Sequence, residues 1–214
     1  MNKKYDVILF DMDGTIADTD PMIIDTMNAL YDKYKGGKRR PPEEIVYFSG
    51  PPIRDTLARE FPDQDPEEMY NVFKRVSEGF YASCVTAYKD EIEVLIKLKE
   101  KGYLLGVVTN KGYPLTIYSL EICGIKHLFD VVISADDVKI PKPDPTGIYN
   151  ALNKLGISDK KEVLYIGDND IDYITATNAG VDTLLVTWGP RKINVLDKAK
   201  YLAKSYNDIG GILL

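Results

Sequence analysis

Residues 7–15 read Val-Ile-Leu-Phe-Asp-Met-Asp-Gly-Thr, four apolar residues followed directly by two acids on either side of a methionine and then a glycine. A short apolar run of this kind is typical of a strand that is buried on both faces of a parallel sheet. Open α/β sheets bind their ligands outside the carboxyl ends of the strands. Asp11 and Asp13 therefore lie where such a sheet carries its chemistry.

Four further apolar runs along the chain resemble the first and predict four more buried strands. These are residues 104–108, 131–133, 163–166 and 183–186. Segments with helical spacing separate them, among them the helix expected after Asp144-Pro145, where Asp144 is the predicted N-cap. The alternation predicts an α/β fold, a doubly wound, Rossmann-like parallel sheet with helices on both faces. A short edge element and a closing helix are expected within residues 195–214.

Residues 17–88 interrupt this alternation, because they contain helical patterns but no convincing strand. Ile23, Met27 and Leu30 fall on one face of a first helix. Asp65 and Glu68 have the spacing of a capping box at the start of a second helix. We therefore expect a core formed by residues 1–16 and 89–214, with a helical cap, residues 17–88, inserted into it.

The composition of the 214 residues excludes several classes of protein. There are 27 Lys and Arg residues against 33 Asp and Glu residues, a formal net charge of −6. This balance gives no general attraction to nucleic acid or to an anionic membrane. The apolar runs are too short for a membrane span or a signal peptide, so we expect a soluble cytoplasmic protein. Cys84 and Cys123 have no metal-binding spacing and are expected to be buried, reduced thiols.

Polar residues follow four successive predicted strands. Thr109 and Asn110 follow the second run, Lys142 follows the third, and Asp168 to Asp172 follow the fourth. Each group alone has an ordinary explanation: a turn, a helix N-cap, a solvated lysine or an acidic first turn of a helix. Their joint placement, together with the two acids after the first run, predicts one site.

The residue types at this site indicate metal-assisted phosphoryl transfer. Side chains two residues apart on extended backbone point the same way, so Asp11 and Asp13 can act together. One carboxylate attacks phosphorus, and the other donates a proton to the leaving oxygen and later accepts one from water. Asp168 and Asp172 supply oxygen atoms or orient the ligands of an octahedral Mg²⁺.

The remaining groups suit the phosphate itself. The hydroxyl of Thr109 and backbone amides near Gly14 and Asn110 can hold phosphate oxygens. The ammonium of Lys142 neutralises negative charge on the transferring group. We therefore expect Gly14, Thr109, Asn110 and Lys142 to bind phosphate.

The four segments resemble, in order, the four motifs of the haloacid dehalogenase superfamily. They read Asp-Met-Asp-Gly-Thr at 11–15, Thr-Asn at 109–110, Lys-Pro-Asp-Pro at 142–145 and Gly-Asp-x-x-x-Asp at 167–172. The resemblance covers essentially the whole chain, and the helical insertion resembles the cap of the subfamily that includes phosphoglycolate phosphatases. It implies an enzyme, a Mg²⁺-dependent phosphatase that hydrolyses a small phosphorylated metabolite, phosphoglycolate-like or pyrophosphate, through an aspartyl-phosphate.

The resemblance also implies a role for each residue. Asp11 is the nucleophile, Asp13 is the general acid and base, and Thr109 and Lys142 contact the phosphate. Mg²⁺ binds Asp11, the backbone carbonyl of Asp13 and Asp168, with Asp172 in a supporting role. Asp170 is an additional acid in the last motif, so the division of roles among Asp168, Asp170 and Asp172 stays open.

Two other functions remain as alternatives. Dehalogenases of the superfamily lack the second acid of the first motif, so Asp13 favours phosphate chemistry. Phosphomutases keep both acids but often carry a histidine soon after them, whereas His127, here the only histidine, is expected to be structural or exposed. From another class, receiver-like signalling modules also form an aspartyl-phosphate, but Asp13 and the inserted cap favour turnover.

Substrate specificity is expected in the cap. Arg54 could form a bidentate contact with a substrate carboxylate or second phosphate, or it could be an exposed residue at a helix start. The basic run at 38–40 is expected to be a solvated loop. The physiological substrate and the oligomeric state stay open.

Overall fold

The apolar run that begins at Val7 forms a central strand of a six-stranded parallel sheet in the computed structural model, which describes residues 3–214. The strand order is β5-β4-β1-β6-β7-β8, and all neighbouring strands are parallel. Its strands are β1 (Val7–Phe10), β4 (Leu104–Val108), β5 (Val131–Ile133), β6 (Val163–Gly167), β7 (Asp182–Val186) and β8 (Tyr201–Ala203). The predicted α/β class and all five predicted strands are confirmed.

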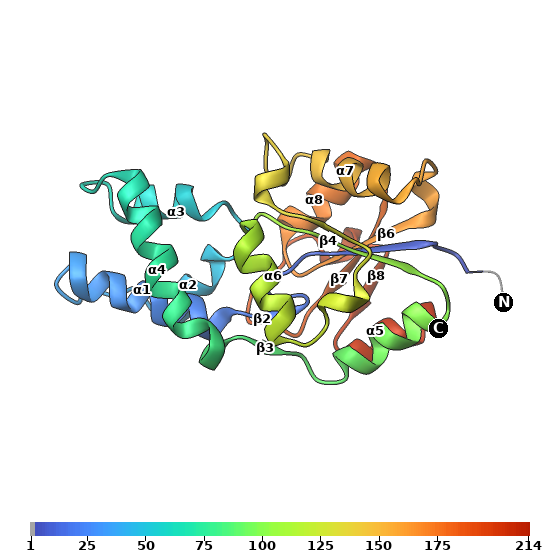
Figure 1. The fold of residues 1–214 in the computed structure, drawn as a ribbon, viewed down its shortest axis with the longest axis horizontal. Helices are drawn as coiled ribbons and strands as arrows, with labels where there is room; N and C mark the ends of the chain where they lie inside the picture. Colours follow the sequence, from blue (N-terminus) through green and yellow to red (C-terminus); the bar gives the residue numbers. More distant parts are fainter. Residues whose placement is uncertain (1–2) are drawn as a thin grey trace.

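Helices cover both faces of the sheet, as Figure 1 shows. The core helices are α5 (Glu91–Glu100), α6 (Tyr113–Ile122), α7 (Thr146–Leu155), α8 (Asp170–Ala179) and α9 (Tyr206–Leu213). Short 3-10 turns are η2 (Lys126–Leu128), η3 (Ala135–Asp137), η4 (Lys160–Glu162) and η5 (Leu196–Lys198). The edge strand β8 and the helix α9 are the elements expected in the last 20 residues.

Alternate residues of β1 enter two different cores. Ile8 and Phe10 belong to the cluster that packs against α5, α6 and α9, whereas Val7 and Leu9 belong to the cluster beneath α7 and α8. All four side chains are fully buried. A strand with both faces covered has no polar position between its ends, and for this reason Asp11 comes only after Phe10.

Between β1 and α5 the chain forms a helical region that lies beside the sheet (Figure 1). It contains α1 (Asp20–Tyr34), α2 (Pro42–Ile45), η1 (Val46–Phe48), α3 (Ile53–Glu60) and α4 (Pro66–Cys84). The region has a hydrophobic cluster of its own, which includes Met27, Leu57 and Phe73. The inserted helical cap is therefore confirmed, while its predicted limits at residues 17 and 88 stay a prediction.

The expectation that residues 17–88 contain no strand was wrong in one respect. β2 (Ala17–Asp18) pairs antiparallel with β3 (Thr86–Ala87), so the chain enters and leaves the cap through a two-stranded ribbon. Strands of two residues are too short to give a periodic pattern, and this ribbon forms only because the two crossings meet in space.

Three local predictions need correction. The Asp65 side chain accepts from the Glu68 amide at 2.9 Å, but only this half of the predicted capping box is found among the described contacts. The helix predicted to follow the N-cap Asp144 has Pro145 as its N-cap residue, although Asp144 Oδ1 still accepts from the Thr146 amide at 2.9 Å. Cys123 is buried as expected, whereas Cys84 is only half-buried. Within residues 3–214, no helix has the length and apolar character to span a membrane.

Candidate active site

The residues predicted for chemistry meet at the carboxyl end of the sheet. Asp11, Thr109, Lys142, Asp168 and Asp172 are all buried, with at most 5% of any of them exposed. Asp11, Asp13 and Thr109 line a cleft of about 740 Å³ between the core and the cap. Lys142 contacts Asp11, and Asp168 and Asp172 cluster with it. The parallel strands thus bring together residues from distant parts of the chain, as the sequence predicted.

Lys142 bridges two of the carboxylates. Its Nζ lies 2.7 Å from Asp11 Oδ1 and 2.7 Å from Asp172 Oδ1. Burial acts to lower the pKa of Lys142, but the two carboxylates outweigh it and hold that pKa well above its usual value. Burial raises the pKa of Asp11, and Lys142 opposes this rise. The Lys142 ammonium is thus held beside Asp11.

Asp172 has protein partners for both of its oxygens. Oδ1 accepts from Lys142, and Oδ2 accepts from the amides of Asp168 and Asn169, both at 3.1 Å. The bond with Asn169 is one half of a capping box at the start of α8. The helix-start explanation for these acids is therefore correct, and the same contacts place Asp168 and Asp172 in the site.

Asp170 points away from the other acids of its motif. Its two oxygens accept hydrogen bonds, each of 2.7 Å, from the amide and the side chain of Asn194. In contrast, ligand atoms of Asp11, Asp168 and Asp172 all lie within 4.8 Å of one another. Three hard carboxylate oxygens in one buried place are a donor set that suits a divalent cation such as Mg²⁺.

Gly14 creates space beside this cluster of carboxylates. Its φ is +83°, a region that favours glycine, and a Cβ at this position would lie 2.2 Å from Asp168 Oδ2. Its own amide donates to the Ala17 carbonyl at 2.9 Å, so that amide is already used within the turn. Among the described contacts, the amides of Met12, Asp13 and Asn110 have no acceptor in the protein.

The side chain of Asn110 connects the second motif to Lys142 and to the cap. Its Oδ1 accepts from the Lys142 amide at 2.8 Å, and its Nδ2 donates to the Gly50 carbonyl at 2.9 Å. These bonds hold the backbone of Lys142 in place and tie it to the second motif and to the cap. The N-cap of the following helix is Gly112, so Thr109 and Asn110 are not helix caps.

Residues 8–186 match the family model described as haloacid dehalogenase-like hydrolase. The chain belongs to this family. Curated relatives include the pyrophosphatase PpaX of Bacillus velezensis, 34% identical over 210 residues that cover 97% of this chain and 96% of the relative. PpaX of Bacillus pumilus is 33% identical over 218 residues, covering 100% of this chain and 99% of the relative.

Solved structures share the fold of this hydrolase over its whole length. A haloacid dehalogenase-like family hydrolase from Streptococcus pneumoniae has a TM-score of 0.86 at 21% identity, covering 98% of each chain. A predicted phosphoglycolate phosphatase from Haemophilus somnus has a TM-score of 0.80 at 23% identity, covering 99% of each chain. The resemblance inferred from the four motifs is confirmed, and the hydrolase is a phosphatase of this superfamily, which implies a small phosphorylated substrate.

Arg191 is a buried residue of the site that the sequence analysis missed. Its Nη1 lies 2.7 Å from Asp168 Oδ2, its Nη2 pairs with Asp20, and its Nε donates to the Val46 carbonyl at 3.0 Å. Burial raises the pKa of Asp168, and Arg191 opposes this rise. No local pattern distinguishes Arg191 from a surface arginine, because only the packing of the loop after β7 places it here.

Lys111 is the second residue that was missed. Its Nζ lies 2.6 Å from Asp13 Oδ1, and only 8% of its side chain is exposed. Its ammonium also lies 5.2 Å from the ring centre of Tyr81, which belongs to α4 of the cap. Its place directly after the Thr-Asn motif was a signal that could have indicated it. Asp13 therefore faces a cation of its own, separate from the one beside Asp11.

The cap residues predicted to matter have different environments. Arg54 lines the cleft, pairs with Glu67 and lies over the Tyr70 ring at 3.8 Å, with about half of its side chain exposed. The basic run at 38–40 is exposed, and its two arginines pair with acids of the cap, Asp32, Glu44 and Glu60. His127 is exposed in η2, away from the cleft.

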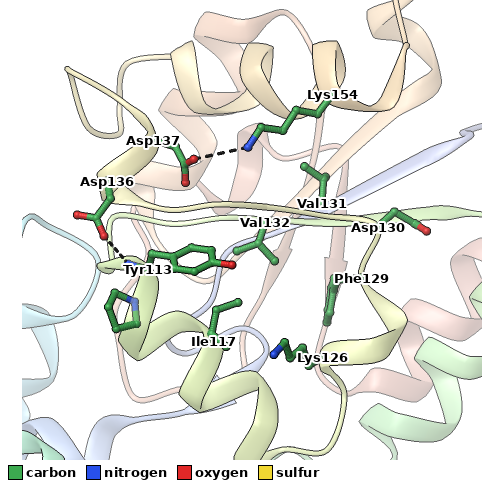
Figure 2. Close-up of a pocket in the computed structure, with 11 residues that line it drawn as sticks. Tyr113, Ile117, Lys126, Phe129, Asp130, Val131, Val132, Asp136, Asp137 and Lys154 are labelled. Atoms are coloured by element: carbon green, nitrogen blue, oxygen red, sulfur yellow. Dashed lines mark hydrogen bonds and ion pairs between the residues drawn. The ribbon is translucent and has the colours of Figure 1, made fainter.

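A second hollow lies at the β5 edge of the sheet, outside the active site (Figure 2). Side chains of α6, β5, η3 and α7 line it. Figure 2 shows the partners of two of its acids: Asp136 accepts from the Tyr113 amide at 2.7 Å, and Asp137 pairs with Lys154 at 3.5 Å. This hollow holds none of the residues predicted for catalysis.

Proposed function

We propose that this hydrolase is a Mg²⁺-dependent phosphatase that acts through an aspartyl-phosphate on a small phosphorylated metabolite. The observation that carries the proposal is the buried position of Asp11 between Lys142 and the carboxylates of the last motif. A carboxylate kept next to a fixed cation, at the bottom of a cleft, is placed to act as a nucleophile toward a phosphate group.

Asp11 forms the new bond to phosphorus through one carboxylate oxygen, and the bond from phosphorus to the leaving oxygen breaks. Lys142 is within hydrogen-bond distance of Asp11, so its ammonium is also placed to offset charge on the transferring group. The Thr109 hydroxyl and the free amides of Met12 and Asn110 are suitable donors for the phosphate oxygens. The Gly14 amide is not a donor in this proposal, because Ala17 already accepts from it.

Asp13 supplies the proton chemistry in this scheme. It protonates the leaving oxygen in the first step and removes a proton from water in the second, when water attacks the phosphorus and releases Asp11. Its carboxylate lies in the same cleft as Asp11 but points to Lys111. The two acids of the first motif thus have different partners, as two different roles require.

Asp11 and Asp168 are the side chains that we propose as Mg²⁺ ligands, with the backbone carbonyl of Asp13. When bound, Mg²⁺ supplies positive charge that draws a phosphate oxygen to the site and offsets the developing charge. Both oxygens of Asp172 already have protein partners, so we assign it to positioning Lys142 and the loop at 168–169. Asp170 has no part in the site.

We propose that the substrate is compact, either phosphoglycolate-like or pyrophosphate. Several of the curated relatives are named pyrophosphatase, and the cleft extends from Asp11 to Arg54. We propose that residues 17–88 form the cap and determine which leaving group fits. The ribbon of β2 and β3, which lies at both proposed limits, supports this division of the chain.

Steady-state phosphate release tests the proposed function. We expect Mg²⁺-dependent turnover of phosphoglycolate or pyrophosphate in a panel with hexose phosphates and nucleoside monophosphates. Asp11→Asn should abolish it, whereas Asp170→Asn should keep it, because Asp170 is bound to Asn194 outside the cluster. Isomerisation of a sugar phosphate without phosphate release would instead identify a mutase. A stable phosphoprotein without turnover would identify a signalling module.

A further inference from the structure

One of the basic side chains that line the cleft, next to Asp13, is almost entirely enclosed by protein. Four basic residues line the cleft: Arg54, Lys74, Lys111 and Lys139. Arg54 is about half exposed and paired with Glu67, Lys74 is half-buried, and Lys139 is exposed. Lys111 differs from these three because only 8% of its side chain is exposed. Its contacts with a ligand would therefore be screened least by water.

The backbone holds Lys111 firmly. Its amide donates to Thr109 Oγ1 at 3.2 Å, and its carbonyl accepts from the Ala135 amide at 3.0 Å. The side chain therefore begins from a fixed point next to the phosphate-binding motif. Tyr81 of the cap and Asp13 of the core contact its ammonium from two sides.

The position of Asp13 shows which part of a substrate Lys111 would contact. Asp13 is the proposed proton donor to the leaving oxygen, so a group bonded to Asp13 lies on the leaving-group side of the phosphorus. An ammonium has three N–H donors, and the bond to Asp13 Oδ1 uses one of them. Because Lys111 itself lines the cleft, its remaining donors can contact a ligand there.

We propose that Lys111 is a specificity residue that binds a negative charge on the leaving group. This inference rests on the proposed phosphatase function and deepens it. The enzyme selects phosphoesters or anhydrides whose leaving group carries its own carboxylate or phosphate. A substrate with an uncharged leaving group leaves the Lys111 ammonium with Asp13 alone and forgoes a charge-assisted hydrogen bond.

A purely structural role of Lys111 makes a different prediction. If Lys111 served only to hold Asp13, its loss would slow all substrates alike, because every substrate uses the same proton donor. If Lys111 binds the leaving group, its loss affects charged leaving groups selectively and acts mainly on KM. The difference between substrates, rather than the activity itself, therefore distinguishes the two roles.

Two matched pairs of substrates provide the test. One is 2-phosphoglycolate with the analogue in which a carboxamide replaces the carboxylate, and the other is pyrophosphate with methyl phosphate. In the wild type, kcat/KM should favour the charged member of at least one pair. In Lys111→Met, kcat/KM for that member should fall about 10- to 100-fold, mainly through KM. For the uncharged substrate of the same pair, kcat/KM of Lys111→Met should change less than about threefold.

Two control variants accompany this measurement. Lys111→Arg keeps the charge and should retain most of the preference. Lys38→Met removes one exposed positive charge from the loop at 38–40 and should leave kcat/KM unchanged for both substrates of the pair. Thermal unfolding of each variant shows whether it folds, and Lys111→Gln replaces Lys111→Met if that protein does not.

The outcomes separate this inference from the proposed function. An equal loss for both members, or no preference in the wild type, overturns the role of Lys111 and leaves the phosphatase assignment intact. Activity that survives in Asp11→Asn, or no hydrolysis of any phosphate compound by the wild type, overturns the proposed function and this inference with it.

Discussion

Arg191 Nη1 lies 2.7 Å from Asp168 Oδ2, within the group of carboxylates that we propose for the metal. The two side chains come from loops that follow different strands, and both are buried. Arg191 also pairs with Asp20 at the start of the cap and with the carbonyl of Val46. A single guanidinium thus connects the proposed metal ligand to the cap.

Replacement of Arg191 is expected to destabilise the protein, because Asp168 and Asp20 would lose their buried counter-charge. Removal of one partner of a buried ion pair typically costs about 3–5 kcal/mol in the free energy of unfolding. We predict a loss of this size in Arg191→Met, measured by chemical denaturation without Mg²⁺. Added Mg²⁺ should then stabilise the variant more than the wild type.

Arg39→Met is the control for this experiment, since Arg39 forms an exposed pair with Asp32. Such exposed pairs contribute little to the free energy of unfolding, because water and salt screen them. Equal stability of Arg191→Met and Arg39→Met would contradict the role given to Arg191.

Gly14→Ala is expected to damage the site although it adds a single methyl group. The new Cβ would lie 2.2 Å from Asp168 Oδ2 and 2.7 Å from Arg191 Nη1, at a φ of +83°. The turn or the Asp168 side chain must therefore move. We predict a loss of Mg²⁺-dependent activity and a lower melting temperature, whereas Gly36→Ala, where a Cβ would meet no atom within 4 Å, leaves activity unchanged.

Asp13→Asn is expected to lower kcat by about 10²–10⁴-fold for alkyl phosphates, because the leaving oxygen loses its proton donor. The loss should be smaller for p-nitrophenyl phosphate, whose leaving group is stable without protonation. Steady-state rates on both substrates provide the comparison. Undiminished hydrolysis of alkyl phosphates would remove Asp13 from the role of general acid.

Glu91 is expected to make the stability of the protein depend on pH. It is fully buried, its Oε1 has no partner among the described residues, and burial raises its pKa from 4.5 to about 8. The folded state therefore holds a proton that the unfolded state releases above pH 4.5. This group's contribution to the free energy of unfolding is fully present below pH 4.5 and falls by up to about 1.4 kcal/mol per pH unit toward pH 8.

Unfolding measured across this pH range provides the test of Glu91. Glu91→Gln cannot ionise, so its stability should fall less between pH 5 and pH 8 than that of the wild type. Glu93→Gln, on the exposed face of the same helix, should keep the wild-type dependence. The same pH dependence in all three proteins would show that Glu91 is ionised in the folded state.

Most of the fold and the core of the site could be predicted because they depend on local patterns. Each buried strand is an unbroken apolar run, and parallel strands bring the residues that follow them to one edge. Asp11, Thr109, Lys142 and Asp168 could be grouped for this reason.

The remaining features depend on contacts between distant segments. Arg191 reaches Asp168 only when the loop after β7 packs against the cap, and Lys111 contacts Asp13 only across two strand ends. The choice between Asp170 and Asp172 required the capping geometry of α8, which faces one acid into the site and the other toward Asn194.

The central claim is that Asp11 becomes covalently phosphorylated during turnover. The most direct measurement quenches the wild-type enzyme during Mg²⁺-dependent turnover, reduces it with borohydride and locates the modified residue by peptide mass spectrometry. Borohydride converts an aspartyl-phosphate to homoserine, so we predict homoserine at position 11, dependent on substrate and absent from Asp11→Asn. Unmodified Asp11 during rapid turnover, or homoserine at another aspartate, would contradict this mechanism.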